Sequence, residues 1–263
     1  MIAEASPRVS EAEAYERGFE VLDKWKHCER DVGASFVFEQ NKSRAENSGF
    51  PSVMEVGRHM GLSEHEVAAV MGWTTGDFRL INPIARGQEE VEFDDYPAGV
   101  KTLCRLHRAE VMPYIYVLNS ALQKLPATSS GPLYRGHRRE VALATGSVIL
   151  LPGFTSVSFD MDSAVKFATQ ANQGRSAKRS LLVIQESFSG RSIAKLSARK
   201  NELEVLFPKD TYFEVIKVDS EAAEKAVADA TVELQKSMPE AEVKVVYLRE
   251  IAQPQEDTAV ALL

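Results

Sequence analysis

The spacing of apolar residues changes at the Pro- and Gly-containing segment 126–132. Before this segment, apolar residues recur three or four positions apart, as on one face of a helix. After it, short apolar runs alternate with turn residues, which is typical of strands. Helices followed by strands indicate an α+β protein, and we predict a helical part followed by mostly antiparallel strands.

The expected elements follow from this spacing. Helices are predicted at residues 10–30, 52–60, 63–72, 97–108, 110–125, 161–171 and 221–238. Strands are predicted from Leu133 and at residues 147–151, 154–158, 181–185, 192–195, 202–207, 212–218 and 243–251. Residues 73–88 are expected to form a bridge interrupted by Gly and Pro, and residues 254–263 a frayed end. Ser63 and Glu66 have the spacing of a helix capping box.

Charge and composition limit the classes of partner. The net charge of −7 argues against broad binding to nucleic-acid phosphates, although it leaves a local basic cleft possible. The paired helices at 52–72 are also typical of a DNA-binding helix-turn-helix, but the second carries no Lys or Arg. No apolar run approaches the roughly 18 residues of a membrane span. We therefore expect no nucleic-acid partner and no membrane span.

The cysteines and the N-terminus bear on location. Cys28 and Cys104 are far apart and lack the spacing of a zinc site or a disulfide framework. The first residues show neither the basic start nor the apolar core of a signal peptide. We expect a cytoplasmic protein, or a bacterial effector secreted without a cleavable signal peptide.

Two acidic residues stand at the start of an apolar run. Glu202 and Glu204 precede Val205, and a Pro-Lys-Asp turn and a second apolar run follow. Residues i and i+2 of a strand face the same way, so both carboxylates would project together. Such closeness is unfavourable unless a cation or a hydrogen-bond donor offsets the repulsion. The alternative is an exposed strand edge with two solvated acids.

Most familiar site motifs are absent. The chain lacks the Gly-rich Rossmann and P-loop patterns, H-E-x-x-H and G-x-S-x-G. Three short segments remain: Leu133-Tyr134-Arg135-Gly136, then residues 153–158 with Ser-Val-Ser, then residues 201–208 with Glu-Leu-Glu.

In these segments, the sequence resembles the arginine-serine-glutamate clade of mono-ADP-ribosyltransferases. That family has an Arg on its first core strand, Ser-x-Ser on the second, and Glu-x-Glu behind a loop. The resemblance extends upstream through Trp73-Thr74, Ile81-Asn82 and Arg86-Gly87 and covers residues 62–218. Val157 replaces the usual Thr between the serines. The four-cysteine pattern of secreted vertebrate members is missing.

The resemblance implies a two-sheet ADP-ribosyltransferase core. It implies an N-terminal helical extension at 1–61 and a catalytic domain at 62–252. The domain would divide into a helical lobe at 62–131 and a β core at 132–252, with a flexible tail at 253–263. The implied reaction breaks the nicotinamide–ribose bond of NAD, the co-substrate, and a nucleophile then captures the ribose, with no metal required. Because nicotinamide leaves as a neutral ring, the reaction needs no general acid.

The resemblance also assigns roles to residues in cleaving NAD. Glu204 would stabilise the positive charge that builds on the ribose, as in glycoside hydrolysis. Ser156 would hold Glu204 by a hydrogen bond, and Arg135 would bind the NAD phosphates through its planar donor fork. The Gly136 backbone would approach the nicotinamide amide, because glycine has no Cβ. The remaining residues expected in the NAD site are Tyr134, Ser158 and Arg175.

Glu202 bears on the acceptor. A protonated guanidinium is a poor nucleophile, and a carboxylate beside it can orient it and take its proton. By resemblance, Glu at this position accompanies arginine acceptors, so we expect transfer to an arginine of a target protein by a monomeric enzyme. The loop at 195–201, with Arg199 and Lys200, would meet that protein. The alternatives are an NAD glycohydrolase with water as acceptor, and a catalytically silent relative that binds a protein partner.

Overall fold

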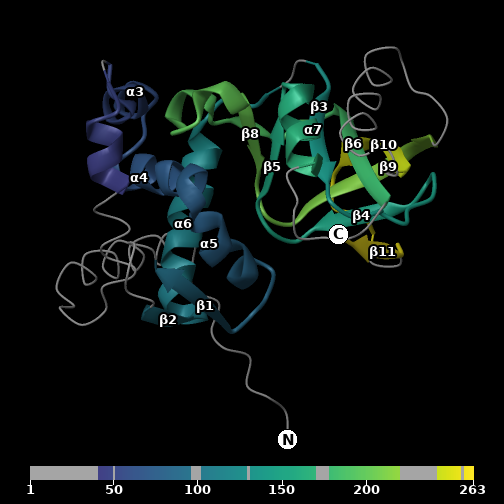
Figure 1. Cartoon of the computed structure of the whole chain (residues 1–263), viewed down its shortest axis with the longest axis horizontal. Coiled ribbons are helices and arrows are strands. Elements are labelled where there is room, and N and C mark those ends of the chain that lie inside the picture. The colour runs from purple at the N-terminus through teal and green to yellow at the C-terminus, as the bar shows by residue number, and fades with distance from the viewer. Residues whose placement is uncertain are drawn as a thin grey trace, which may run out of the picture. The chain divides into compact units, whose positions relative to one another are not determined.

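The structure is a computed structural model that describes residues 41–49, 51–95, 102–128, 131–169, 178–219, 242–255 and 258–263 (Figure 1). The chain forms two compact units, Met1–Lys124 and Leu125–Leu263. The helices expected at 10–30 and 221–238, and the segment with Arg175, lie outside the described residues. The domain boundaries expected from the sequence stay predictions.

Helices dominate the described part of the first unit. Residues 41–46 are helical. The further elements are α3 (Val53–His59), α4 (Glu64–Gly72), the π-helix η1 (Trp73–Asp77), α5 (Phe78–Ala85), β1 (Glu90–Asp95), β2 (Thr102–His107) and α6 (Arg108–Lys124). The helices predicted at 52–60, 63–72 and 110–125 are confirmed as α3, α4 and α6. In the described parts of the chain, no helix is both long and apolar enough to cross a bilayer.

The predicted capping box at the start of α4 is confirmed. The Ser63 hydroxyl accepts a hydrogen bond from the Glu66 amide, and the Glu66 carboxylate accepts one from the Ser63 amide. Glu66 is fully buried, and its carboxylate also accepts hydrogen bonds from Ser120 (2.7 Å) and Lys124 (2.8 Å) of α6. One carboxylate therefore caps α4 and fastens it to α6, with its charge paired inside the unit.

Two predictions in this unit are wrong. Residues 102–107 of the helix expected at 97–108 form strand β2, which pairs antiparallel with β1. The partner strand, in which Val91 and Phe93 alternate with acidic residues, was not predicted, and its hydrogen bonds override local helix propensity. Residues 73–85 of the expected bridge are helical. Gly76 (φ 139°) leaves the helical backbone conformation and forms a kink between two helices, and α5 contains Pro83.

The second unit is built on one large sheet and helix α7 (Met161–Thr169). Its strands are β3 (Leu133–His137), β4 (Val148–Leu151), β5 (Thr155–Ser158), β6 (Lys178–Glu186), β7 (Arg191–Ser192), β8 (Glu204–Phe207), β9 (Thr211–Asp219), β10 (Glu242–Ile251) and β11 (Val260–Leu262). Among the described residues the order is β11-β4-β9-β10-β6-β3-β5-β8-β7. Only β11–β4 and β10–β6 are parallel, so the mostly antiparallel arrangement is confirmed.

The sheet folds over on itself. Strands β3 and β5 are joined through a single registered pair, Tyr134 opposite Ser158. Phe207 of β8 and Phe213 of β9 meet edge to face at 5.2 Å, although these strands are not neighbours in the sheet. Both rings belong to one buried apolar cluster that draws on strands from both ends of the strand order. The two halves therefore pack face to face as a sandwich, which agrees with the α+β fold and two-sheet core expected.

Helix α7 covers the other face of the sheet at β3, β6 and β10. Ala164 and Ala168 of α7 pack with Leu181 and Tyr247 on this face, and α7 lies against the sheet in Figure 1. The approach to β3 is close because Gly136 has no side chain. A Cβ at Gly136 would lie 2.0 Å from the Ala164 carbonyl oxygen and 2.8 Å from the Ala168 Cβ.

Three strand boundaries differ from prediction. The strand expected at 192–195 is β7 (Arg191–Ser192), followed by the 3-10 helix η2 (Ala194–Leu196). Strand β8 begins at Glu204, because residues 200–202 form the 3-10 helix η3 (Lys200–Glu202). The expectation of a frayed end is wrong for β11, which pairs in parallel with β4. Backbone hydrogen bonding to a distant strand, which local sequence does not encode, decides that last case.

A buried carboxylate, Asp77, lies at the end of η1. Asp77 is buried, and its Oδ2 accepts hydrogen bonds from Asn41 (2.9 Å) and from the Tyr114 hydroxyl (2.9 Å). Gly72 packs against these groups so closely that a Cβ there would lie within 2.3 Å of all three. Burial raises the pKa of Asp77, against the opposing effect of these hydrogen bonds and of the Arg44 charge.

We predict that Gly136→Ala lowers the free energy of unfolding by about 2 kcal/mol or more, because the new methyl group meets backbone of α7 that cannot turn aside. Urea denaturation measures the change. Gly190→Ala is the control, since its Cβ would approach only side chains, at 3.0 Å or more. Equal stability of the two variants would contradict the packing role of Gly136.

We predict that Asp77→Asn becomes more stable relative to wild type as the pH rises from about 4 to 7. The raised pKa means that the folded protein binds a proton at Asp77 more tightly than the unfolded chain does, so the stability from this group is lost as pH rises through the folded pKa. An amide oxygen in place of Oδ2 can accept the same two hydrogen bonds without a charge. Urea denaturation across this range should show a difference in the free energy of unfolding that grows as the pH rises. A difference that stays constant with pH would contradict this account.

Candidate active site

Three of the predicted site residues meet on adjacent strands. Arg135 lies on β3, Ser156 on β5 and Glu204 on β8, in the order β3-β5-β8. The Ser156 hydroxyl donates a hydrogen bond of 2.5 Å to Oε1 of Glu204. Nη1 of Arg135 donates one of 2.5 Å to the backbone oxygen of Ser156. Residues separated by up to 69 positions, by the numbers 135 and 204, are thereby gathered at one place on the sheet.

The strand register explains the Ser156–Glu204 contact. Ser156 stands opposite Leu206, and Glu204 opposite Ser158, so Ser156 and Glu204 are diagonal neighbours across the β5–β8 pair. Diagonal neighbours on one face lie within reach of longer side chains. A one-residue slip of β8 would turn Glu204 to the opposite face and break the contact.

Glu204 is buried at the start of β8. Glu204 is 7% exposed, and the next three residues of β8 are buried and apolar. Its backbone oxygen accepts a hydrogen bond from the Ile193 amide at 3.0 Å. A carboxylate with a fixed rotamer and little contact with water interacts strongly with any positive charge placed before it.

Glu202 lies in a different environment from Glu204. The prediction that both carboxylates project from one face of a strand is wrong. Glu202 ends η3, and Leu203 takes left-handed backbone angles (φ 45°, ψ 44°) before β8 begins. The alternation of a strand therefore does not govern residues 202–204. The Glu202 side chain is 45% exposed, and its Oε1 lies 3.2 Å from Nη1 of Arg199. This contact with a guanidinium was not predicted from the sequence.

Ser158 connects backbone segments. Its hydroxyl donates to the Glu202 backbone oxygen at 2.6 Å and accepts from the Asp160 amide at 2.8 Å. Ser158 therefore fixes the end of η3 beside β5, which positions both glutamates. Its expected place in the NAD site stays a prediction.

Gly136, which follows Arg135, has a packing role that the sequence did not show. The position that a Gly136 Cβ would occupy is filled by α7, so the absent side chain serves helix packing. The expected approach of the Gly136 backbone to nicotinamide stays a prediction. Tyr134 is half-buried on β3 opposite Ser158, and Arg175 lies outside the described residues.

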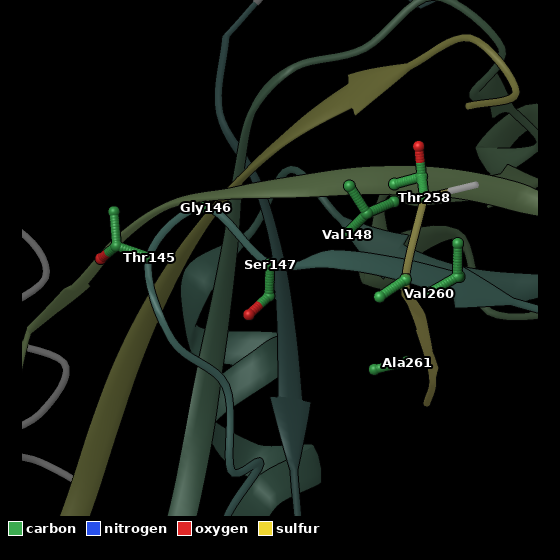
Figure 2. A pocket seen from close by; sticks show the side chains of 8 residues that line it. Thr145, Gly146, Ser147, Val148, Thr258, Val260 and Ala261 are labelled. Carbon is green, nitrogen blue, oxygen red and sulfur yellow. The ribbon is translucent and has the colours of Figure 1, made fainter. Parts of the chain in front are cut away.

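A surface hollow lies elsewhere in the second unit. Its lining comes from residues 145–148 at the start of β4 and residues 258–261 around β11, and Figure 2 shows the side chains of Val148 and Val260 there. None of the predicted site residues lines it. The arrangement of Arg135, Ser156 and Glu204 is thus separate from this hollow.

The sequence matches a known family over most of its length. Residues 29–237 match the family model described as NAD:arginine ADP-ribosyltransferase. The putative NAD(+)–arginine ADP-ribosyltransferase Vis of Vibrio splendidus is 33% identical over 116 residues, which are 42% of this chain and 46% of the relative. The NAD(+)–protein-arginine ADP-ribosyltransferase Tre1 of Serratia proteamaculans is 28% identical over 162 residues, 59% of this chain and 29% of that protein. The chain therefore spans less than half the length of these two relatives.

Solved structures share the fold. The crystal structure of Vis in complex with agmatine has a TM-score of 0.54 at 20% identity and covers 98% of this chain and 94% of that one. The eukaryotic mono-ADP-ribosyltransferase ART2.2 has a TM-score of 0.56 at 16% identity, covering 94% and 90%. At these identities the likeness concerns the fold alone, whereas the family model covers well over half of the sequence. The chain belongs to the NAD:arginine ADP-ribosyltransferase family.

Proposed function

We propose that this chain transfers ADP-ribose from NAD to an arginine of a target protein and releases nicotinamide. The observation that carries the proposal is the buried Glu204 carboxylate, held by the Ser156 hydroxyl and neighboured by Arg135 through the Ser156 carbonyl. Because the similar protein Vis of Vibrio splendidus is a toxin, the proposal includes a role as a bacterial toxin or effector.

Glu204 is proposed to stabilise the transition state. As the bond from ribose to nicotinamide breaks, positive charge develops on the sugar, and a carboxylate beside it lowers the barrier. At about 4 Å and an effective dielectric near 20, such a pair contributes roughly 4 kcal/mol, or about a thousandfold in rate. Ser156 acts as a positioning residue, because its hydrogen bond holds Oε1 of Glu204.

Arg135 is proposed to bind the NAD diphosphate. Its side chain comes from the strand beside Ser156 and is held there by the Ser156 carbonyl oxygen. A guanidinium suits phosphate oxygens, since its planar fork donates two parallel hydrogen bonds. Tyr134, Gly136, Ser158 and Arg175 complete the proposed NAD site.

The contact between Glu202 and Arg199 supports arginine as the acceptor. Glu202 already holds a guanidinium in this structure, the same group that an acceptor arginine would bring. Exposed ion pairs of this kind contribute only about 0.2–1 kcal/mol, so an incoming arginine can displace Arg199 at small cost. Glu202 would then orient the acceptor and take its proton as the new bond forms.

Water is the alternative acceptor, which would make the protein an NAD glycohydrolase. The half-exposed position of Glu202 favours this alternative, because water reaches the carboxylate. The residues proposed to cleave NAD serve both reactions equally, so only Glu202 separates them.

We predict that Glu204→Gln lowers nicotinamide release from NAD about a thousandfold, because the amide keeps the shape and loses the charge. Chromatographic assay of nicotinamide measures this. Glu250→Gln is the matched control: Glu250 is also buried on a strand, 6% exposed, and accepts hydrogen bonds from the Phe188 and Ser189 amides. Release within tenfold of wild type in Glu204→Gln would reject the assignment.

We predict that Glu202→Gln lowers modification of agmatine, a small guanidine, about a hundredfold while NAD hydrolysis changes only a few-fold. Mass spectrometry of modified agmatine and chromatography of free ADP-ribose measure the two products. Glu214→Gln is the control, because Glu214 is also a partly exposed glutamate paired with an arginine, Arg249, at 2.6 Å. If Glu202→Gln lowered hydrolysis and left agmatine modification intact, the proposed division between the glutamates would be wrong.

A further inference from the structure

Leu203, between the two glutamates, has backbone angles that suit glycine better than leucine. Its φ of 45° and ψ of 44° lie in the left-handed region. Among the described residues, the other positions with positive φ are six glycines and Asp210. Glycine and, less often, Asn or Asp adopt this conformation readily, whereas a Cβ-branched or large apolar side chain makes it unfavourable. The conformation therefore does not explain the choice of leucine here.

The conformation of Leu203 is fixed by its neighbours. The Leu203 amide donates to the Lys200 carbonyl oxygen at 3.4 Å, and the Leu203 carbonyl oxygen accepts from the Phe159 amide at 3.3 Å. The Ser158 hydroxyl holds the preceding carbonyl, that of Glu202. The backbone is thus held on both sides of Leu203, so the left-handed turn is part of the fold of this segment.

Burial does not explain the leucine either. The residue is 46% exposed, one of a few large apolar residues exposed in the described part of the chain. The residues before it, Arg199, Lys200 and Asn201, are exposed and polar. An apolar side chain that is unfavourably placed for the backbone and half in water contributes little to folding.

Resting on the proposed function, we propose that Leu203 determines acceptor specificity by packing against apolar side chains next to the target arginine. Leu203 adjoins Glu202, which would hold the acceptor guanidinium, and precedes the buried Glu204. An arginine bound to Glu202 therefore brings its flanking residues toward Leu203. The partner is a protein segment in which the modified arginine is flanked by leucine or another apolar residue.

The test compares two synthetic peptides that carry one arginine, flanked by leucines in one and by serines in the other. The readout is the ratio of kcat/KM for the two peptides with the full chain and NAD, followed by mass spectrometry. We expect wild type to prefer the leucine-flanked peptide about fivefold or more, because a bound leucine would remove the exposed part of Leu203 from water. Leu203→Gly and Leu203→Asn, which both suit the left-handed turn, should bring the ratio close to one.

Asp210→Gly is the matched control, since it also replaces a residue of positive φ (61°) with glycine, in the turn after β8. It should keep the wild-type ratio. Thermal melting shows that the Leu203 variants are folded, and Leu203→Asn separates loss of the side chain from added backbone freedom.

Two results would overturn the proposal on its own: wild type modifies agmatine without preferring the leucine-flanked peptide, or the Leu203 variants keep the preference. Failure of wild type to modify agmatine or either peptide would instead reject the proposed arginine transfer together with this inference.

Discussion

The hydrogen bond between Ser156 and Glu204 is the interaction on which the proposed chemistry depends. A carboxylate that leaves water loses solvation, and it is tolerated in a protein only when donors or cations compensate. Here the Ser156 hydroxyl supplies the bond, and Arg135 is fixed to the same residue through its carbonyl oxygen. Because the contact crosses β5 and β8 diagonally, the register of this strand pair determines the geometry of the site.

The two glutamates of the Glu-Leu-Glu segment lie in different environments although one residue separates them. Glu204 is buried and bound to a hydroxyl, whereas Glu202 is half-exposed and bound to a guanidinium. The left-handed turn at Leu203 ends the 3-10 helix and starts the strand, and so produces this difference. Different surroundings suit paired carboxylates to different tasks, which agrees with the separate roles proposed for Glu204 and Glu202.

Buried acids also shape the helical unit, by two routes. Glu66 has a cationic partner, Lys124, besides its role in the cap of α4. Asp77 is held by the neutral donors Asn41 and Tyr114, and burial raises its pKa. The first arrangement keeps a charge inside the unit, while the second makes the charge unfavourable. The hydrogen-bonding and charged partners of each buried acid therefore decide whether its negative charge is favourable.

The sequence by itself determined the fold class, the helices α3, α4 and α6, and most strands of the core, because these depend on periodicity and caps within a few residues. It also selected Arg135, Ser156 and Glu204, since their residue types and order resemble a family whose model matches the chain. Only the tertiary structure decided that β2 and β11 are strands, because each depends on a hydrogen-bonding partner elsewhere in the chain. It alone gave Gly136 its packing role against α7 and separated Glu202 from Glu204 at Leu203. These features arise from contacts between distant segments and from one unusual pair of backbone angles, which local residue patterns do not encode.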